Sequence, residues 1–179
     1  MHPAQDLHCN KHAQRGTALV MTLVFLVLLT MLGITAINTS TLEEKMAGNT
    51  KDQNLSFQAA ETALRAAETW VESTTAATSL AANNANGLYD PSTTVTEWWD
   101  SIDWSLSTGL VIYPGVPGTP ASGTLGDVRT RPKYIIEKVS TEALVPTGTR
   151  VTVRITARGT GASDSTVSMV QSNYSKTYP

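Results

Sequence analysis

Cysteine, histidine and charge are each absent from long stretches of this 179-residue chain. The one cysteine, Cys9, and all three histidines lie within the first 16 residues. The remaining chain therefore cannot form a disulfide, and it lacks the usual zinc ligands, the commonest general base and the best thiol nucleophile. We expect a protein that is not an enzyme and that uses no cofactor and no metal.

Charge is missing between Arg15 and Glu43, and within that gap residues 17–37 form a run of 21 mostly apolar residues. At about 1.5 Å per residue, a helix of this length spans roughly 31 Å, which matches the hydrocarbon core of a bilayer. Buried helices of soluble proteins seldom need so long an uncharged run. We therefore expect one transmembrane helix.

The polar segment before this run carries the basic residues Lys11 and Arg15, which predict that the N-terminus stays in the cytoplasm. A secretory signal peptide does not fit, because its apolar region has only about 7–15 residues and a small-residue cleavage site follows it. No Ala-x-Ala site follows this run, and the small residue Gly16 stands directly before it.

Arg15-Gly16 followed by an apolar helix resembles the leader of type IV pilins. The resemblance implies that a prepilin peptidase cuts between Gly16 and Thr17 and methylates the new N-terminus at Thr17. The helix is then kept, first as a membrane anchor and later as filament core. Two further segments are similar to the N-terminal part of the PilX minor pilins, and a third is similar to their late strand: residues 39–49 (TSTLEEKMAGN), 57–65 (FQAAETALR) and 154–161 (RITARGTG).

Met21 is the fifth residue after the expected cleavage, where most pilins have glutamate. The family glutamate is thought to pair with the N-terminal amine of a neighbouring subunit, and an ionised carboxylate in lipid is otherwise costly. Met21 cannot make that pair. In one interpretation it is an ordinary lipid-facing residue, and in the other the subunit needs no neighbour ahead of it and sits at the tip.

The chain after the apolar run has an amphipathic pattern. Residues 41–44 (TLEE) fit a capping box that restarts the helix after a break. Gly33 and Gly48 either lie within one continuous helix or mark where it melts during filament packing. We expect the helix to end between residues 72 and 84 and to pack on a sheet through apolar residues spaced three and four apart. These are Phe57, Ala60, Leu64, Ala67 and Val71, with Ala63 and Trp70 beside them.

The prolines and glycines of residues 87–127 predict loops, with one short strand at 109–113. Trp98, Trp99 and Trp104 either cover the sheet or form a sugar- or surface-binding patch.

Strand patterns follow at residues 133–139, 150–158 and 165–172, and the short connections predict antiparallel pairing. Arg150, Arg154 and Arg158 then line the solvated face, as a solubility feature or as a docking surface.

The expected fold class is α+β and pilin-like, with a long N-terminal helix packed on a small antiparallel sheet. We divide the chain into a leader (1–16), a transmembrane and filament-core helix (17–40), an amphipathic half of the helix (41–84) and a β-rich periplasmic head (85–179). The leader holds two of the 13 basic and one of the 15 acidic side chains, so its removal leaves a net charge of −3. That balance predicts no nucleic-acid binding, which needs a basic stripe.

The resemblance implies a structural minor pilin that primes type IV pilus assembly, sits at or near the tip, and supports twitching motility and adhesion. The implied partners are other minor pilins, the major pilin, the prepilin peptidase and an inner-membrane assembly platform. The chain would cross the bacterial inner membrane once, with its head in the periplasm, before it joins the extracellular pilus. Two alternatives remain open: a minor pseudopilin of a type II secretion system and a single-pass periplasmic binding protein.

Overall fold

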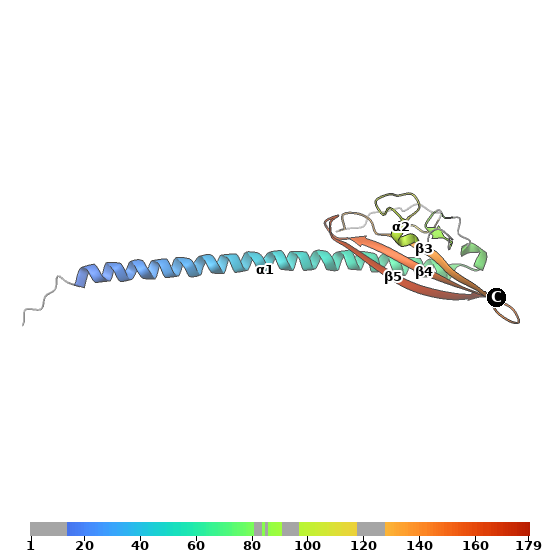
Figure 1. Cartoon of the computed structure of the whole chain (residues 1–179), viewed down its shortest axis with the longest axis horizontal. Coiled ribbons are helices and arrows are strands. Elements are labelled where there is room, and N and C mark those ends of the chain that lie inside the picture. The colour runs from blue at the N-terminus through green and yellow to red at the C-terminus, as the bar shows by residue number, and fades with distance from the viewer. Residues whose placement is uncertain (1–13, 81–83, 85, 91–96, 118–127) are drawn as a thin grey trace, which may run out of the picture. The chain divides into compact units, whose positions relative to one another are not determined.

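The computed structural model describes residues 14–80, 84, 86–90, 97–117 and 128–179 (Figure 1). It divides into two compact units, Met1–Gly48 and Asn49–Pro179, and we call the second one the sheet unit. A long helix followed by a small sheet makes the fold α+β, as predicted. The elements are α1 (Gln14–Ser73), the 3-10 helix η1 (Ala77–Leu80), β1 (Leu88–Tyr89), α2 (Trp98–Ser101), β2 (Val111–Ile112), β3 (Lys133–Ala143), β4 (Thr149–Thr160) and β5 (Val167–Tyr178).

Helix α1 is continuous over 60 residues and ends within the predicted window. The Thr41 hydroxyl donates back to the helical carbonyls of Ile37 (3.2 Å) and Asn38 (2.9 Å). The predicted restart at residues 41–44 is therefore wrong, because the preceding turn is already helical and occupies the hydroxyl that would cap a new start. Gly33 and Gly48 lie inside α1, and a Cβ added at either would meet nothing within 4 Å.

The five strands form one sheet in the order β1-β3-β4-β5, with β2 also paired to β3. β2, β3, β4 and β5 pair antiparallel, as predicted, whereas the two-residue strand β1 runs parallel to β3. The β4–β5 register is unbroken from Thr149↔Tyr178 to Thr160↔Val167. β5 thus extends six residues beyond the predicted end at residue 172, because its in-and-out alternation continues through polar side chains.

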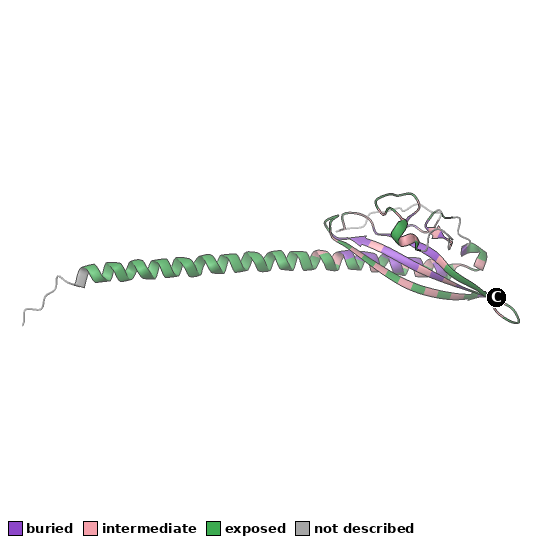
Figure 2. Cartoon of the chain, in the orientation of Figure 1, coloured by how far each residue is buried: buried purple, intermediate pink, exposed green. Residues whose placement is uncertain are grey.

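The last third of α1 packs on one face of the sheet through small side chains (Figure 2). Phe57, predicted to face the sheet, is 50% exposed, and Ser56 is fully buried instead. The cause is the approach of β4, since a Cβ added at Gly159 would collide with the Ser56 carbonyl oxygen and the Ala60 nitrogen. The buried set on the two elements is Ala60, Ala63, Leu64, Ala67, Val71, Val151, Val153, Ile155 and Ala157.

A second apolar cluster lies on the opposite face of β3, where Ile135 points away from α1. Trp98, Trp99 and Trp104 pack against it, and the Trp98 ring centroid lies 4.8 Å from that of Tyr89. The Trp98 and Trp104 indole N–H groups donate to the backbone carbonyls of Asp90 (2.8 Å) and Trp99 (2.9 Å). The three tryptophans therefore cover the sheet, which is the first of the two roles considered for them.

Candidate functional site

The apolar segment, residues 17–37 of α1, presents large apolar side chains on the surface of the helix. Its large side chains are all exposed, from 44% for Val27 to 69% for Leu19. The exposed residues include consecutive positions 23–29 and so surround the helix on every side. α1 is also the one described helix that is long and apolar enough to cross a membrane. A surface of this kind needs lipid or other helices around it.

Three threonines within the apolar segment bond to backbone carbonyls of the same helix. The hydroxyls of Thr22 and Thr30 donate to the carbonyls of Leu19 (2.9 Å) and Val27 (2.8 Å). Thr35 makes the same kind of bond to Met31 (2.9 Å). Because polar groups in hydrocarbon must be satisfied internally, these bonds make the segment compatible with a bilayer core.

The junction between Gly16 and Thr17 lies in the first turn of α1, two residues after the helix begins at Gln14. Both residues are exposed, and a Cβ added at Gly16 would meet nothing within 4 Å. The first turn of a helix has unpaired N–H groups and frays readily. Arg15 belongs to the same turn, while Lys11 lies outside the described residues.

Met21 lies one helical turn after Thr17 and is 59% exposed. No acidic residue occurs between the leader and Glu43, so no other carboxylate of the segment replaces the one expected at this position. The surface around Met21 is apolar throughout the segment.

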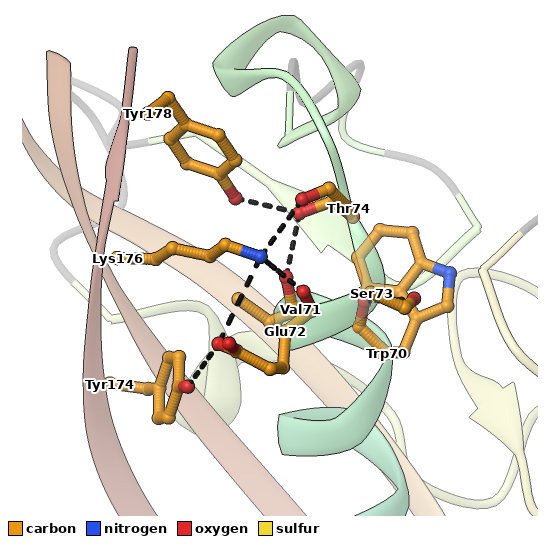
Figure 3. A network of polar contacts seen from close by, with 8 residues as sticks. All are labelled: Trp70, Val71, Glu72, Ser73, Thr74, Tyr174, Lys176 and Tyr178. Carbon is orange, nitrogen blue, oxygen red and sulfur yellow. Dashed lines mark hydrogen bonds and ion pairs between the residues drawn. The ribbon is translucent and has the colours of Figure 1, made fainter. Parts of the chain in front are cut away.

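The C-terminal end of α1 is closed by a lysine from β5 (Figure 3). The Lys176 ammonium donates to the carbonyls of Glu72, Thr74 (2.9 Å) and Val71 (3.4 Å), at the end of the helix where intrahelical N–H donors run out. Beside it, the Tyr174 hydroxyl donates to the Glu72 carboxylate at 2.5 Å. The positive charge also complements the helix dipole, so this contact joins α1 to the sheet.

Asp52 holds the β4–β5 loop against α1. Its Oδ1 accepts the Ala162 N–H at 2.5 Å. Hydrogen bonds from the Thr166 hydroxyl and from the Ala162 and Ser163 N–H groups lower the pKa of this carboxyl. Neither Asp52 nor Lys176 was singled out from the sequence, although two glycines at the end of β4, Gly159 and Gly161, are a signal of close backbone approach.

Glu137 is the buried carboxylate of the tryptophan-covered face. It is 5% exposed, and its Oε1 accepts the Trp98 N–H at 2.6 Å. Burial raises the pKa of Glu137, while the Trp98 N–H and the charge of Arg154 oppose that shift. Glu137 therefore anchors the start of α2 on β3.

The row of Arg150, Arg154 and Arg158 is not the open, solvated face that the alternation predicts. Arg154 binds Glu97 at 3.3 Å and its side chain is only 24% exposed, because the segment that carries α2 folds over β3 and reaches β4. Arg150 pairs with Glu142 at 3.7 Å and remains exposed. Among the described residues, acidic side chains therefore pair with Arg150 and Arg154 of this row.

The described residues contain no group of three or more His, Cys, Asp or Glu side chains suited to a metal ion. The polar clusters of Lys176, Asp52 and Glu137 each join one element to another. The surface that most needs an external partner is therefore the apolar segment.

Residues 15–65 match the family model for the PilX N-terminal segment. This match supports a type IV pilin of the PilX family. The match begins at the residue before Gly16 and covers the whole apolar segment together with the first part of α1 in the sheet unit. Neither the curated proteins nor the solved structures yield a significant match.

A PilX N-terminal segment supports a minor pilin of the type IV pilus, and pilins as a family are structural proteins. A PilX N-terminal segment and an uncovered apolar helix together fit membrane anchoring and interaction with other pilus components. The match ends at residue 65, so the sheet and its tryptophan-covered face lie outside it.

Proposed function

We propose that this minor pilin primes type IV pilus assembly and sits at or near the pilus tip, where it supports twitching motility and adhesion. The observation that carries the proposal is the apolar segment, which is exposed on all sides, follows a basic leader and has Met21 in place of the usual glutamate. A subunit without that carboxylate needs no amine from a preceding neighbour and fits the first position of a filament.

Processing at Gly16 is the first step of the proposed function. The peptidase cuts between Gly16 and Thr17 and methylates Thr17, which removes Lys11 and Arg15 together with the rest of the leader. The proposed division of the mature chain is an anchor and filament-core helix (17–40), an amphipathic half (41–84) and a periplasmic head (85–179).

Assembly then exchanges one apolar environment for another. In the inner membrane, lipid covers the apolar segment; in the filament, the helices of other minor pilins and of the major pilin replace lipid. The assembly platform of the inner membrane supplies the site of this exchange. Van der Waals packing between helices then stabilises the filament core.

The test is N-terminal sequencing of the protein extracted from membranes of cells that make the full chain. The proposal expects a start at N-methylated Thr17, and it expects the Gly16→Val variant to keep its leader, because a bulky side chain then occupies the cleavage position. The Thr17→Ala variant is the matched control, since it keeps Gly16 and should still be cut. An intact leader in the unaltered chain would exclude every pilin-type function and leave a single-pass binding protein.

Deletion of the chain separates the two remaining candidates, the type IV pilus and the type II secretion pseudopilus. Loss of surface pili and of twitching, with enzyme secretion unchanged, supports the pilus. Loss of secreted enzymes with normal pili identifies a pseudopilin instead.

A further inference from the structure

We propose that β5 is a docking edge, on which an extended, uncharged segment of a partner polypeptide adds one more strand to the sheet. β5 is the last strand in the sheet order, and within the described residues no strand pairs with its other side (Figure 1). It is 12 residues long. An unpaired strand of that length offers a row of backbone donors and acceptors that another extended chain satisfies.

The unpaired backbone groups of β5 can be assigned to particular residues. The Gly161 N–H donates to the Thr166 carbonyl at 3.0 Å, which sets the phase of the unbroken β4–β5 register. Because alternate residues of an antiparallel strand bond to the same neighbour, every second residue of β5 directs its N–H and carbonyl away from β4. These residues are Val167, Met169, Gln171, Asn173, Ser175 and Thr177.

Natural sheets usually protect such an edge with charge, proline, a bulge or a covering element. β5 has none of the first three: its outward residues are all uncharged, it contains no proline, and its register has no shift. Its one charged residue, Lys176, points to the end of α1 and so does not guard the edge.

The other side of the same sheet provides the contrast. Strands β1 and β2 pair with the first part of β3, and a bulge interrupts β3 between Lys138 and Ser140. Two charged residues, Lys138 and Glu142, stand on the remaining part of that strand, paired with Asp90 and Arg150. One edge of the sheet therefore carries several protective features, and β5 carries none of them.

Charge and geometry decide which occupant fits. The outward row is neutral and partly apolar, with Val167 41% and Met169 43% exposed, so it suits a partner strand with few charges. A second copy fits poorly, because two-fold pairing of β5 with β5 would run the two α1 helices in opposite directions. That last step rests on the proposed function, in which both helices enter from one membrane.

The experiment uses the full chain in cells that assemble pili, with a photo-crosslinking residue at Ser175. Asn173→Pro removes one outward N–H without removing a bond to β4, and edge strands tolerate proline at such positions. Asn173→Ala is the matched control, because it changes the side chain and keeps the N–H. Proline should lower the crosslink yield about tenfold, the effect of losing one or two hydrogen bonds, and alanine should change it less than about twofold.

Equal yields from the proline and alanine variants would overturn the docking edge, and so would a crosslink to a second copy of this chain. If Asn173→Pro fails to fold, as judged by its unfolding temperature, the double variant Gln171→Lys/Asn173→Lys replaces it, because it adds the missing edge charges. It should reduce the yield by a similar factor, and an unchanged yield overturns the proposal. A crosslinker at Thr62, on the exposed side of α1, should give a yield that none of these variants alters.

The two proposals fail separately. If the chain is cut after Gly16 and supports pili, but Asn173→Pro does not change the crosslink yield at Ser175, only the docking edge is contradicted. A chain that keeps its leader contradicts the pilin function, whatever the crosslinks at Ser175 do.

Discussion

Lys176 carries more of the stability of the sheet unit than its place on an edge strand suggests. Lys176→Met keeps the aliphatic length and removes the ammonium that bonds the carbonyls at the end of α1. We expect a loss of about 1–2 kcal/mol in the free energy of unfolding, the range for a partly buried cation at a helix C-terminus. Denaturant unfolding of the full chain in detergent measures it.

Arg65→Met is the matched control for the lysine. Arg65 also forms an ion pair, with Glu61 at 3.7 Å, but its side chain is 77% exposed. Its replacement should change the free energy of unfolding by less than about 0.5 kcal/mol. Similar losses from both variants would contradict the capping role of Lys176.

Glu137 makes the stability of the sheet unit depend on pH. Burial raises the pKa of Glu137 in the folded state, so the folded chain keeps a proton that the unfolded chain has already lost. The stability of the folded state therefore falls as the pH rises from the ordinary pKa of glutamate towards the folded pKa of Glu137. Glu137→Gln cannot lose that proton and still accepts the Trp98 N–H. The unfolding temperature of the variant, relative to the unaltered chain, should therefore rise as the pH increases from the ordinary glutamate pKa of 4.5 through the folded pKa of Glu137.

Asp52 provides the opposite case. The hydrogen bonds of Asp52 lower its pKa in the folded state. Its contribution to the free energy of unfolding is therefore fully present above the unfolded pKa and is lost as the pH falls through the folded pKa. Asp52→Asn should therefore lose stability relative to the unaltered chain as the pH rises from the folded pKa of Asp52 to just above the ordinary aspartate pKa of 3.8. Parallel pH profiles for the Glu137 and Asp52 variants would contradict both assignments.

Two glycines of the chain have opposite roles at the scale of the secondary-structure elements. Gly159 lies where β4 meets α1, and an added Cβ would meet backbone atoms of Ser56 and Ala60. We expect Gly159→Ala to cost about 1–3 kcal/mol or more, since rigid backbone must move to admit the methyl group. Differential scanning calorimetry of the full chain in detergent detects this as a lower unfolding temperature.

Gly48→Ala is the matched substitution in open surroundings. Its Cβ would meet nothing within 4 Å inside a helix, so we expect about 0.5–1 kcal/mol greater helix stability. If Gly48 also serves as the point where the helix melts during filament packing, the same variant should form fewer pili despite its greater stability. Unchanged pilus number would contradict the melting role.

The elements that sequence predicts best are those whose pattern is local. The apolar segment follows from the absence of charge, and β4 follows from alternation within a few residues. The prediction that Phe57 faces the sheet is wrong for a physical reason. Helical spacing identifies the apolar side of the helix, but the close approach of Gly159 decides which residues on that side contact the sheet. The ion pair between Arg154 and Glu97 joins residues that are 57 positions apart in the sequence. A pattern within a few residues cannot predict such a contact.

At the scale of the whole molecule, the apolar segment and the β5 edge need partners of different chemistry. The apolar segment needs contact with lipid or helices, and the hydroxyls of Thr22, Thr30 and Thr35 are already bonded to backbone carbonyls. The β5 edge needs hydrogen bonds from an extended chain and little charge. Separate variants can therefore disturb membrane anchoring and strand docking independently.

The final prediction tests why this pilin would stand first in a filament. Met21→Glu restores the usual carboxylate, which is costly in lipid when it is unpaired. Pairing with the N-terminal amine of a subunit ahead removes that cost, so the variant should move from pilus ends to positions along the shaft. Immunogold labelling of sheared pili measures the distribution. Met21→Leu, which adds no charge, should stay at the ends, and end-labelling by both variants would show that Met21 does not determine position.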